Sequence, residues 1–155
     1  MPKEVVDLFH AIVAKLSPSH PFVPMDPTGD GALIFFKTSL QAVRFADELL
    51  DKLHISNCSE PLKQWHRKVR IGIGTGSVFL SARYAPDGAV VAFEAAGDAI
   101  IDAVRLQAAS REKSMCISDK TRIKLPGSWP DRFESPKALK AKKYVVIGCH
   151  YKSRA

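Results

Sequence analysis

The stretch Pro27-Thr28-Gly29-Asp30-Gly31-Ala32-Leu33-Ile34-Phe35-Phe36 decides the fold, because a tight Gly-Asp-Gly turn is followed there by five apolar residues. Strand-like residues (Phe22, Val23) precede the turn, so the segment predicts a β-hairpin. Glycines on both sides of Asp30 permit positive φ and leave the carboxylate unobstructed. A carboxylate on a rigid hairpin tip is suited to hold a hard cation such as Mg²⁺ beside a polyphosphate. On this segment alone, the plainer interpretation that Asp-Gly only forms the turn stays open.

Length and composition favour one globular domain over residues 1–155, with 46% hydrophobic and 25% charged residues. No apolar run approaches the roughly 20 residues that cross a bilayer, and the charged start (Lys3, Glu4) is unlike a signal peptide. The three cysteines lack the spacing of a disulfide framework or a zinc site. We therefore expect a cytoplasmic protein with no membrane association.

The net charge of +7 suggests an anionic partner, which could be a nucleotide, a nucleic acid or an acidic protein face. Basic residues cluster at 63–70 and 137–143. Such clusters are equally typical of a solvated surface, so charge alone does not select the partner.

Hydrophobic periodicity and capping signals alternate along the chain between helical and strand-like segments. A capping box formed by Thr38 and Gln41 opens the second helix, Asp98 is the expected N-cap of the third, and residues 55–67 and 126–137 are expected to be connections. The predicted helices are 4–16, 38–53, 99–109 and 120–123. The predicted strands are the hairpin around Asp30, 68–80, 89–93, 114–117 and 144–151. This order predicts an α+β fold with a mostly antiparallel sheet.

Three segments in the same order resemble the catalytic domain of class III adenylate/guanylate cyclases. The first is the helix and Thr-Gly-Asp-Gly hairpin of residues 5–36. The second, Val69-Arg70-Ile71-Gly72-Ile73-Gly74-Thr75-Gly76-Ser77-Val78, resembles that family's RIGI-x-TG-x-V strand. The third, Gly97-Asp98-Ala99-Ile100-Ile101-Asp102-Ala103-Val104-Arg105-Leu106, is similar to its GDAVNLAARL helix. The resemblance implies a ferredoxin-like sheet with helices packed on one face.

The family forms cyclic nucleotides from nucleoside triphosphates at the interface of a dimer, with two aspartates holding two Mg²⁺ or Mn²⁺ ions. By this resemblance, Asp30 is the second metal-binding aspartate and Arg105 stabilises the transition state. Lys140 is the nearest match to the phosphate-binding lysine, with Lys142 as its rival. From the residues alone, Arg105 could instead be a surface arginine paired with Asp102 or Glu94.

The chain also departs from the family at several positions. The first strand, which carries the other metal aspartate, has no counterpart in these residues, so we expect another strand to close the resulting gap in the sheet. The base-selecting positions hold Asp26 and Glu94, and the ribose-orienting asparagine is Ile101, which cannot form a hydrogen bond. These departures predict weak or no activity for the chain alone.

Three functions remain open. The favoured one is a cyclase-like domain that is weak or inactive by itself and pairs with a second copy or another cyclase-like chain. An active cyclase of non-adenine specificity, completed by a partner or an upstream segment, is the alternative. A basic nucleic-acid-binding domain is least favoured, because the strand with Val69, Ile71 and Ile73 offers no aromatic residue for stacking on bases.

Overall fold

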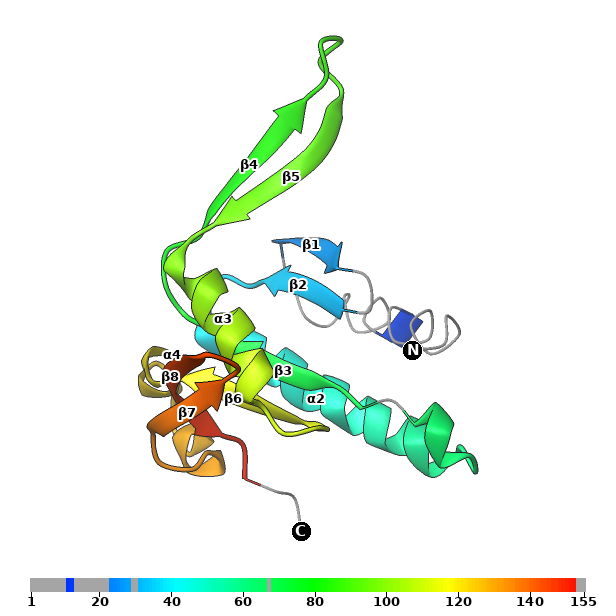
Figure 1. Cartoon of the computed structure of the whole chain (residues 1–155), viewed down its shortest axis with the longest axis vertical. Coiled ribbons are helices and arrows are strands. Elements are labelled where there is room, and N and C mark those ends of the chain that lie inside the picture. The colour runs from blue at the N-terminus through cyan, green and yellow to red at the C-terminus, as the bar shows by residue number, and fades with distance from the viewer. Residues whose placement is uncertain (1–10, 13–22, 29–30, 67, 153–155) are drawn as a thin grey trace.

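The computed structural model describes residues 11–12, 23–28, 31–66 and 68–152 (Figure 1). The predicted hairpin is present: β1 (Val23–Thr28) pairs antiparallel with β2 (Gly31–Phe35). Asp30 and Gly29 at its tip lie outside the described residues, as does most of the predicted helix 4–16, of which residues 11–12 are helical.

Helix α2 (Ser39–Cys58) begins with the predicted capping box. The Thr38 hydroxyl accepts from the backbone N–H of Gln41 at 3.2 Å, and the Gln41 side chain accepts from the Thr38 N–H at 3.2 Å. The helix continues past its predicted end at residue 53, because no glycine or proline interrupts it before Pro61. The predicted connection 55–67 is therefore shorter, and it contains the 3₁₀ turn η2 (Lys63–Trp65).

A four-stranded sheet in the order β3-β6-β8-β7 forms the centre of the fold. Strands β3 (Arg70–Ile73) and β6 (Ser114–Ser118) are parallel, and the remaining pairs are antiparallel. The α+β class is confirmed, but α2 and α3 (Asp98–Ala109) cover opposite faces of this sheet instead of one. Alternation along β3 explains the difference: Ile71 and Ile73 pack toward α2, while Gly72 faces α3.

The glycines of β3 allow α3 to lie directly on the strand backbone, as their pattern predicted. A Cβ at Gly72 would overlap the carbonyl of Ala103 and the amide of Gln107. The predicted long strand 68–80 is nevertheless wrong, because regular pairing stops at Ile73 and resumes at Phe79. The chain bends there around the start of α3, where Gly97 (φ 147°) lies against the carbonyl of Ser77.

After this bend, the chain forms a long projecting hairpin, here called the arm (Figure 1). Its strands are β4 (Phe79–Tyr84) and β5 (Val90–Ala96), joined through the predicted turn at 86–88. The arm carries large apolar side chains that are at least two-fifths exposed: Phe79, Leu80, Tyr84, Val90 and Val91.

Among the described residues, the hairpin β1-β2 forms a sheet of its own, so β2 pairs only with β1 and β3 only with β6. Helix α2 connects the two sheets by side-chain packing, since its residue Phe45 belongs to a cluster that includes Ile34 of β2 and Ile71 of β3. Among the described residues no other strand joins β2 to β3, so the strand expected to close a gap in the sheet stays a prediction.

The C-terminal segment completes the sheet. Ser118 caps α4 (Asp119–Ile123) as predicted, with its hydroxyl accepting from the Thr121 N–H at 3.1 Å. The predicted loop 126–137 contains the 3₁₀ turn η3 (Trp129–Arg132) and leads into β7 (Lys137–Ala141), a strand that the sequence did not predict. The last strand, β8 (Tyr144–His150), matches its prediction.

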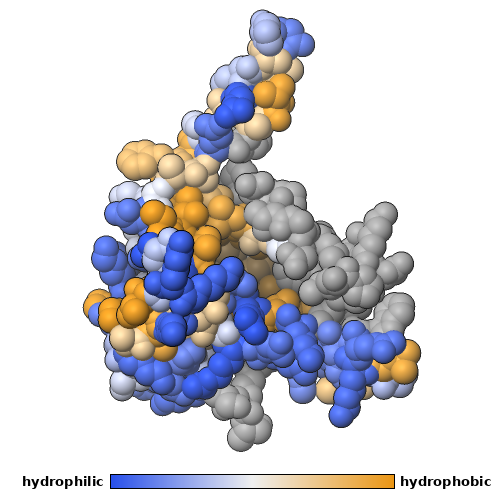
Figure 2. Space-filling model, in the orientation of Figure 1, coloured by the Kyte–Doolittle hydropathy of each residue, from blue (hydrophilic) through white to orange (hydrophobic). Residues whose placement is uncertain are grey.

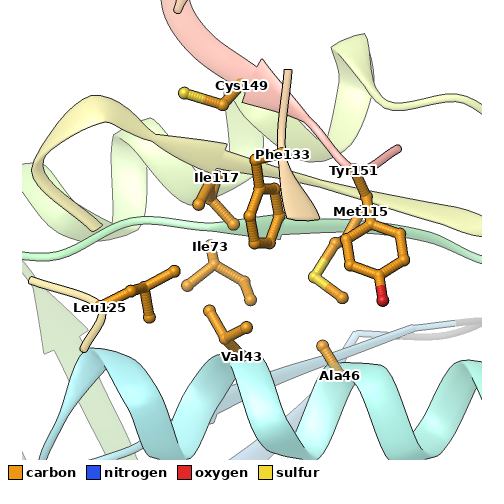
Figure 3. Close-up of a cluster of buried hydrophobic side chains, with 9 residues drawn as sticks. All are labelled: Val43, Ala46, Ile73, Met115, Ile117, Leu125, Phe133, Cys149 and Tyr151. Atoms are coloured by element: carbon orange, nitrogen blue, oxygen red, sulfur yellow. The ribbon is translucent and has the colours of Figure 1, made fainter. Parts of the chain in front are cut away.

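The main core lies between α2 and the sheet (Figure 3). It comprises Val43, Ala46, Ile73, Met115, Ile117, Leu125, Phe133, Cys149 and Tyr151. All three cysteines, Cys58, Cys116 and Cys149, are free thiols. In the described part of the chain, no helix has the length and hydrophobicity to traverse a bilayer.

Candidate functional site

Helix α3 presents one face on which two of the predicted site residues lie together. Ile101 and Arg105 are four residues apart and therefore project from neighbouring positions on the same side of the helix. The next residue, Leu106, is turned about 100° around the helix and is fully buried against the sheet. Ile101 is 49% exposed, so this face of α3 presents an apolar side chain directly beside the arginine.

The guanidinium of Arg105 lies over the ring of Tyr144, with Cζ 4.4 Å from the ring centroid. The ammonium of Lys143 lies 5.7 Å from the same centroid. Neither cation forms an ion pair with any described residue, so the suggested pairing of Arg105 with Asp102 or Glu94 is absent. Lys143 and Tyr144 were not predicted as site residues, because only the β7-β8 register brings them to α3.

Lys140 projects from the other face of the sheet. Its strand neighbours Leu139 and Ala141 are buried with Leu106 of α3, and alternation sends Lys140 to the opposite side beside Val145. Lys142, its rival, occupies the hairpin turn with φ 55°. Within one chain, therefore, Lys143 is the lysine that shares a contact with Arg105.

The predicted base-selecting residues lie on the two hairpins. Glu94 is on the arm, exposed, and its carboxylate forms an ion pair with Arg83 of the adjacent strand. Asp26 is on β1, in register with Leu33. Asp30 lies outside the described residues, so its relation to these positions stays a prediction.

A cavity of about 340 Å³ adjoins the first turns of α3. Asp98 and Asp102 line it from the helix, and Lys120 lines it from α4. Asp98 is the first helical residue and not the predicted N-cap, since Gly97 occupies the cap position without a side-chain hydrogen bond. The remaining lining residues are Thr75, Gly76, Ser77, Phe79 and Gly97.

A chain of hydroxyls fixes the loop at the base of this cavity. The Thr75 hydroxyl lies 2.8 Å from that of Ser39 at the start of α2 and 2.7 Å from that of Thr121 in α4. Thr121 is in turn 2.8 Å from the hydroxyl of Ser118. These contacts anchor the loop between β3 and β4 to two helix N-termini.

The buried cysteine-histidine pair is not a nucleophilic site. The thiol of Cys116 lies 3.0 Å from Nδ1 of His150, which resembles a catalytic pair. Burial, together with the neighbouring Cys149, raises the pKa of the Cys116 thiol to about 12. Burial also lowers the pKa of His150. Both groups are therefore neutral near pH 7, and the pair acts in packing.

The described residues do not provide a metal site by themselves, since they contain no group of three acidic, histidine or cysteine side chains close enough to share an ion. The predicted ligand Asp30 is not among them. We therefore assign none of the described side chains to a Mg²⁺ or Mn²⁺ ion.

Comparison with solved structures shows the fold of adenylate and guanylate cyclases. The guanylate cyclase domain of RhGC from Catenaria anguillulae, solved with GTP, matches with a TM-score of 0.73 and 16% identity over 100% of this chain and 87% of its own. The adenylate/guanylate cyclase/hydrolase from Silicibacter pomeroyi matches with a TM-score of 0.70 and 24% identity, over 96% and 83%. Adenylate cyclases from Trypanosoma brucei in their monomeric state match with a TM-score of 0.65 and 16% identity, over 96% and 77%. No protein-family model matches the sequence, and no curated protein matches it.

Proposed function

We propose that this chain is a nucleotidyl cyclase-like domain that binds a nucleoside triphosphate and has little or no cyclase activity by itself. The observation that carries the proposal is the face of α3 within a cyclase fold: Arg105 is available for a phosphate, while Ile101 beside it is apolar. An unpaired guanidinium can neutralise charge that develops on a phosphate. An isoleucine cannot orient a ribose hydroxyl by hydrogen bonding.

Without a hydrogen bond to orient the ribose hydroxyl, the rate of the cyclase reaction is expected to fall. Each 1.4 kcal/mol of lost transition-state stabilisation lowers the rate about tenfold, and misplacing the reacting hydroxyl removes part of the advantage of proximity. If Asp30 holds its cation without a second carboxylate, the ion keeps most of its water and is positioned less well. We therefore expect these departures to weaken nucleotide binding less than they lower the rate of the cyclase reaction.

We further propose that a second copy, or another cyclase-like chain, covers the arm and the adjacent part of α3. Figure 2 shows apolar surface on the arm and at the start of α3. Val90 and Val91 are 50% and 59% exposed, and Val104 on α3 is 57% exposed. Exposed apolar side chains gathered on neighbouring elements favour an interaction site in a protein of this kind.

The nucleic-acid alternative has less support. Proteins that read RNA on a sheet need an open face with aromatic residues on it. Here α3 covers one face of the four-stranded sheet and α2 covers much of the other. On the face away from α3, the exposed positions of β8 hold Val145 and Ile147, which are aliphatic. The exposed ring of Tyr144, on the other face, already lies against Arg105.

The test is to incubate the chain with each of the four nucleoside triphosphates and Mn²⁺, measuring binding by calorimetry and cyclic products by mass spectrometry. We expect binding of at least one nucleotide, weakened by Arg105→Gln, with little or no cyclic product. Product that disappears in Asp30→Ala would show an active cyclase and defeat the inactive assignment. Absence of nucleotide binding would defeat the proposed function altogether.

A further inference from the structure

We propose that Tyr144 is a positioning residue for Arg105, holding its guanidinium ready to meet the phosphate groups of an anionic ligand. This inference rests on the proposed function for the identity of that ligand, a nucleoside polyphosphate. The contact itself is a cation-π arrangement, with Arg105 Cζ 4.4 Å from the centroid of the Tyr144 ring.

The β7-β8 hairpin places the ring where α3 passes. Ala141 and Tyr144 are the last pair of the ladder before the turn, so both side chains lie on the face that α3 covers. Ala141 is buried and small, which leaves room beside it for a ring. Leu106 is fully buried next to Arg105, so α3 cannot rotate to take the guanidinium elsewhere without exposing a core side chain.

The charges around the ring indicate an anionic ligand. Lys143 is 5.7 Å from the same ring centroid, so two positive charges share one aromatic ring. No described carboxylate forms an ion pair with either cation, although Asp102 is only three residues before Arg105 on the same helix. Two like charges held near each other repel, and a bound anion would relieve that repulsion. The ring is 46% exposed, so the surrounding solvent can be displaced by a ligand.

Positioning should affect affinity because a free arginine side chain loses several rotatable bonds when it binds. Because the ring already restricts the guanidinium, part of this conformational freedom is lost when the chain folds and no longer has to be lost when the ligand binds. Removing the ring should therefore weaken phosphate binding by about two- to fivefold, the range expected from an exposed cation-π contact. The phenol oxygen has no part in this contact, so phenylalanine should replace tyrosine fully.

The experiment measures binding of inorganic tripolyphosphate by calorimetry to the unsubstituted chain and to Tyr144→Phe, Tyr144→Leu, Arg105→Gln and the double variant Tyr144→Leu/Arg105→Gln. Val145→Leu is the matched control, because Val145 is the next residue of β8 and points away from α3. Thermal unfolding of each variant verifies the fold. In parallel, NMR records the Arg105 side-chain protons, which a ring 4.4 Å away shifts upfield.

We expect Tyr144→Leu to weaken tripolyphosphate binding and to abolish the upfield shift, while Tyr144→Phe and Val145→Leu change neither. In the Arg105→Gln background, Tyr144→Leu should have no further effect. The proposal is overturned by tighter binding in Tyr144→Leu, by an equal loss in both backgrounds, or by no tripolyphosphate binding to the unsubstituted chain. A chain that binds tripolyphosphate in this way but no nucleoside triphosphate would defeat the proposed function and leave the role of Tyr144 intact.

Discussion

Gly72 should be the most sensitive position at the contact between β3 and α3. A methyl group there would overlap backbone atoms of Ala103 and Gln107, which cannot move without shifting the whole helix. Overpacking a core costs roughly 1–3 kcal/mol, and we expect Gly72→Ala at the upper end, about 3 kcal/mol, because rigid backbone is in the way. Gly76 is the matched control, since its methyl group would lie 3.5 Å from the Ala99 side chain, an ordinary contact.

Urea denaturation followed by circular dichroism measures the difference. With a urea m-value of about 2 kcal/mol/M, Gly72→Ala should lower the midpoint by about 1.5 M. Gly76→Ala should leave the midpoint nearly unchanged or raise it slightly, because alanine restricts the unfolded chain. The reasoning is refuted if the urea midpoints of the two variants lie within about 0.3 M of each other, because their free energies of unfolding would then differ by only about 0.6 kcal/mol.

Three further predictions concern the site and the core. Lys143→Gln should weaken tripolyphosphate binding about two- to fivefold, and Lys140→Gln should weaken it less. A larger effect of Lys140→Gln would instead favour Lys140, the lysine implied by the family resemblance. Leu106→Ala should lower the free energy of unfolding by about 2–5 kcal/mol in the same denaturation assay, since this side chain is fully buried; a loss under 1 kcal/mol would contradict the packing of α3. Burial and the hydrogen bond to Asp47 raise the pKa of Tyr151 from 10.0 to about 12, so this group stabilises the fold below pH 10 and the stabilisation is lost as the pH rises toward 12. Tyr151→Phe should therefore lose less stability than the unsubstituted chain between pH 9 and pH 12, and equal losses would show that Tyr151 does not titrate this way.

The elements that the sequence predicted correctly have local causes. Thr38 and Gln41 cap α2 through contacts three residues apart, and Ser118 caps α4 in the same way. The β1-β2 hairpin follows from its turn residues and the apolar run after them. Each of these signals acts over a few residues and needs no information from the rest of the chain.

The errors have tertiary causes. Alternation of Val69, Ile71 and Ile73 predicted a strand that would continue, but the crossing of α3 ends it at Ile73. The segment 137–141, Lys-Ala-Leu-Lys-Ala, has helix-favouring residues and no β-branched side chain, so pairing with β8 decides its conformation.

The candidate site was predictable only in part. Arg105 and Ile101 were found from a motif on one helix, and the structure places them on a common face. Tyr144 and Lys143 were missed because their contact with Arg105 depends on the register of β7 and β8, which lie about forty residues further along the chain. No spacing rule within a single segment reveals such a contact.

The hydroxyl chain through Ser39, Thr75, Thr121 and Ser118 has a directional property. Each hydroxyl has one proton to give, and the Thr121 hydroxyl gives its proton to the backbone carbonyl of Ile73 at 3.4 Å. Thr75 and Ser118 must therefore both donate to the Thr121 oxygen, and Ser39 must donate to Thr75. Turning one hydroxyl round therefore obliges its neighbours to turn with it. The starts of α2 and α4 therefore share one arrangement of hydroxyl protons, which also holds the β3-β4 loop. Rotating any one of the four hydroxyls would break hydrogen bonds of its neighbours.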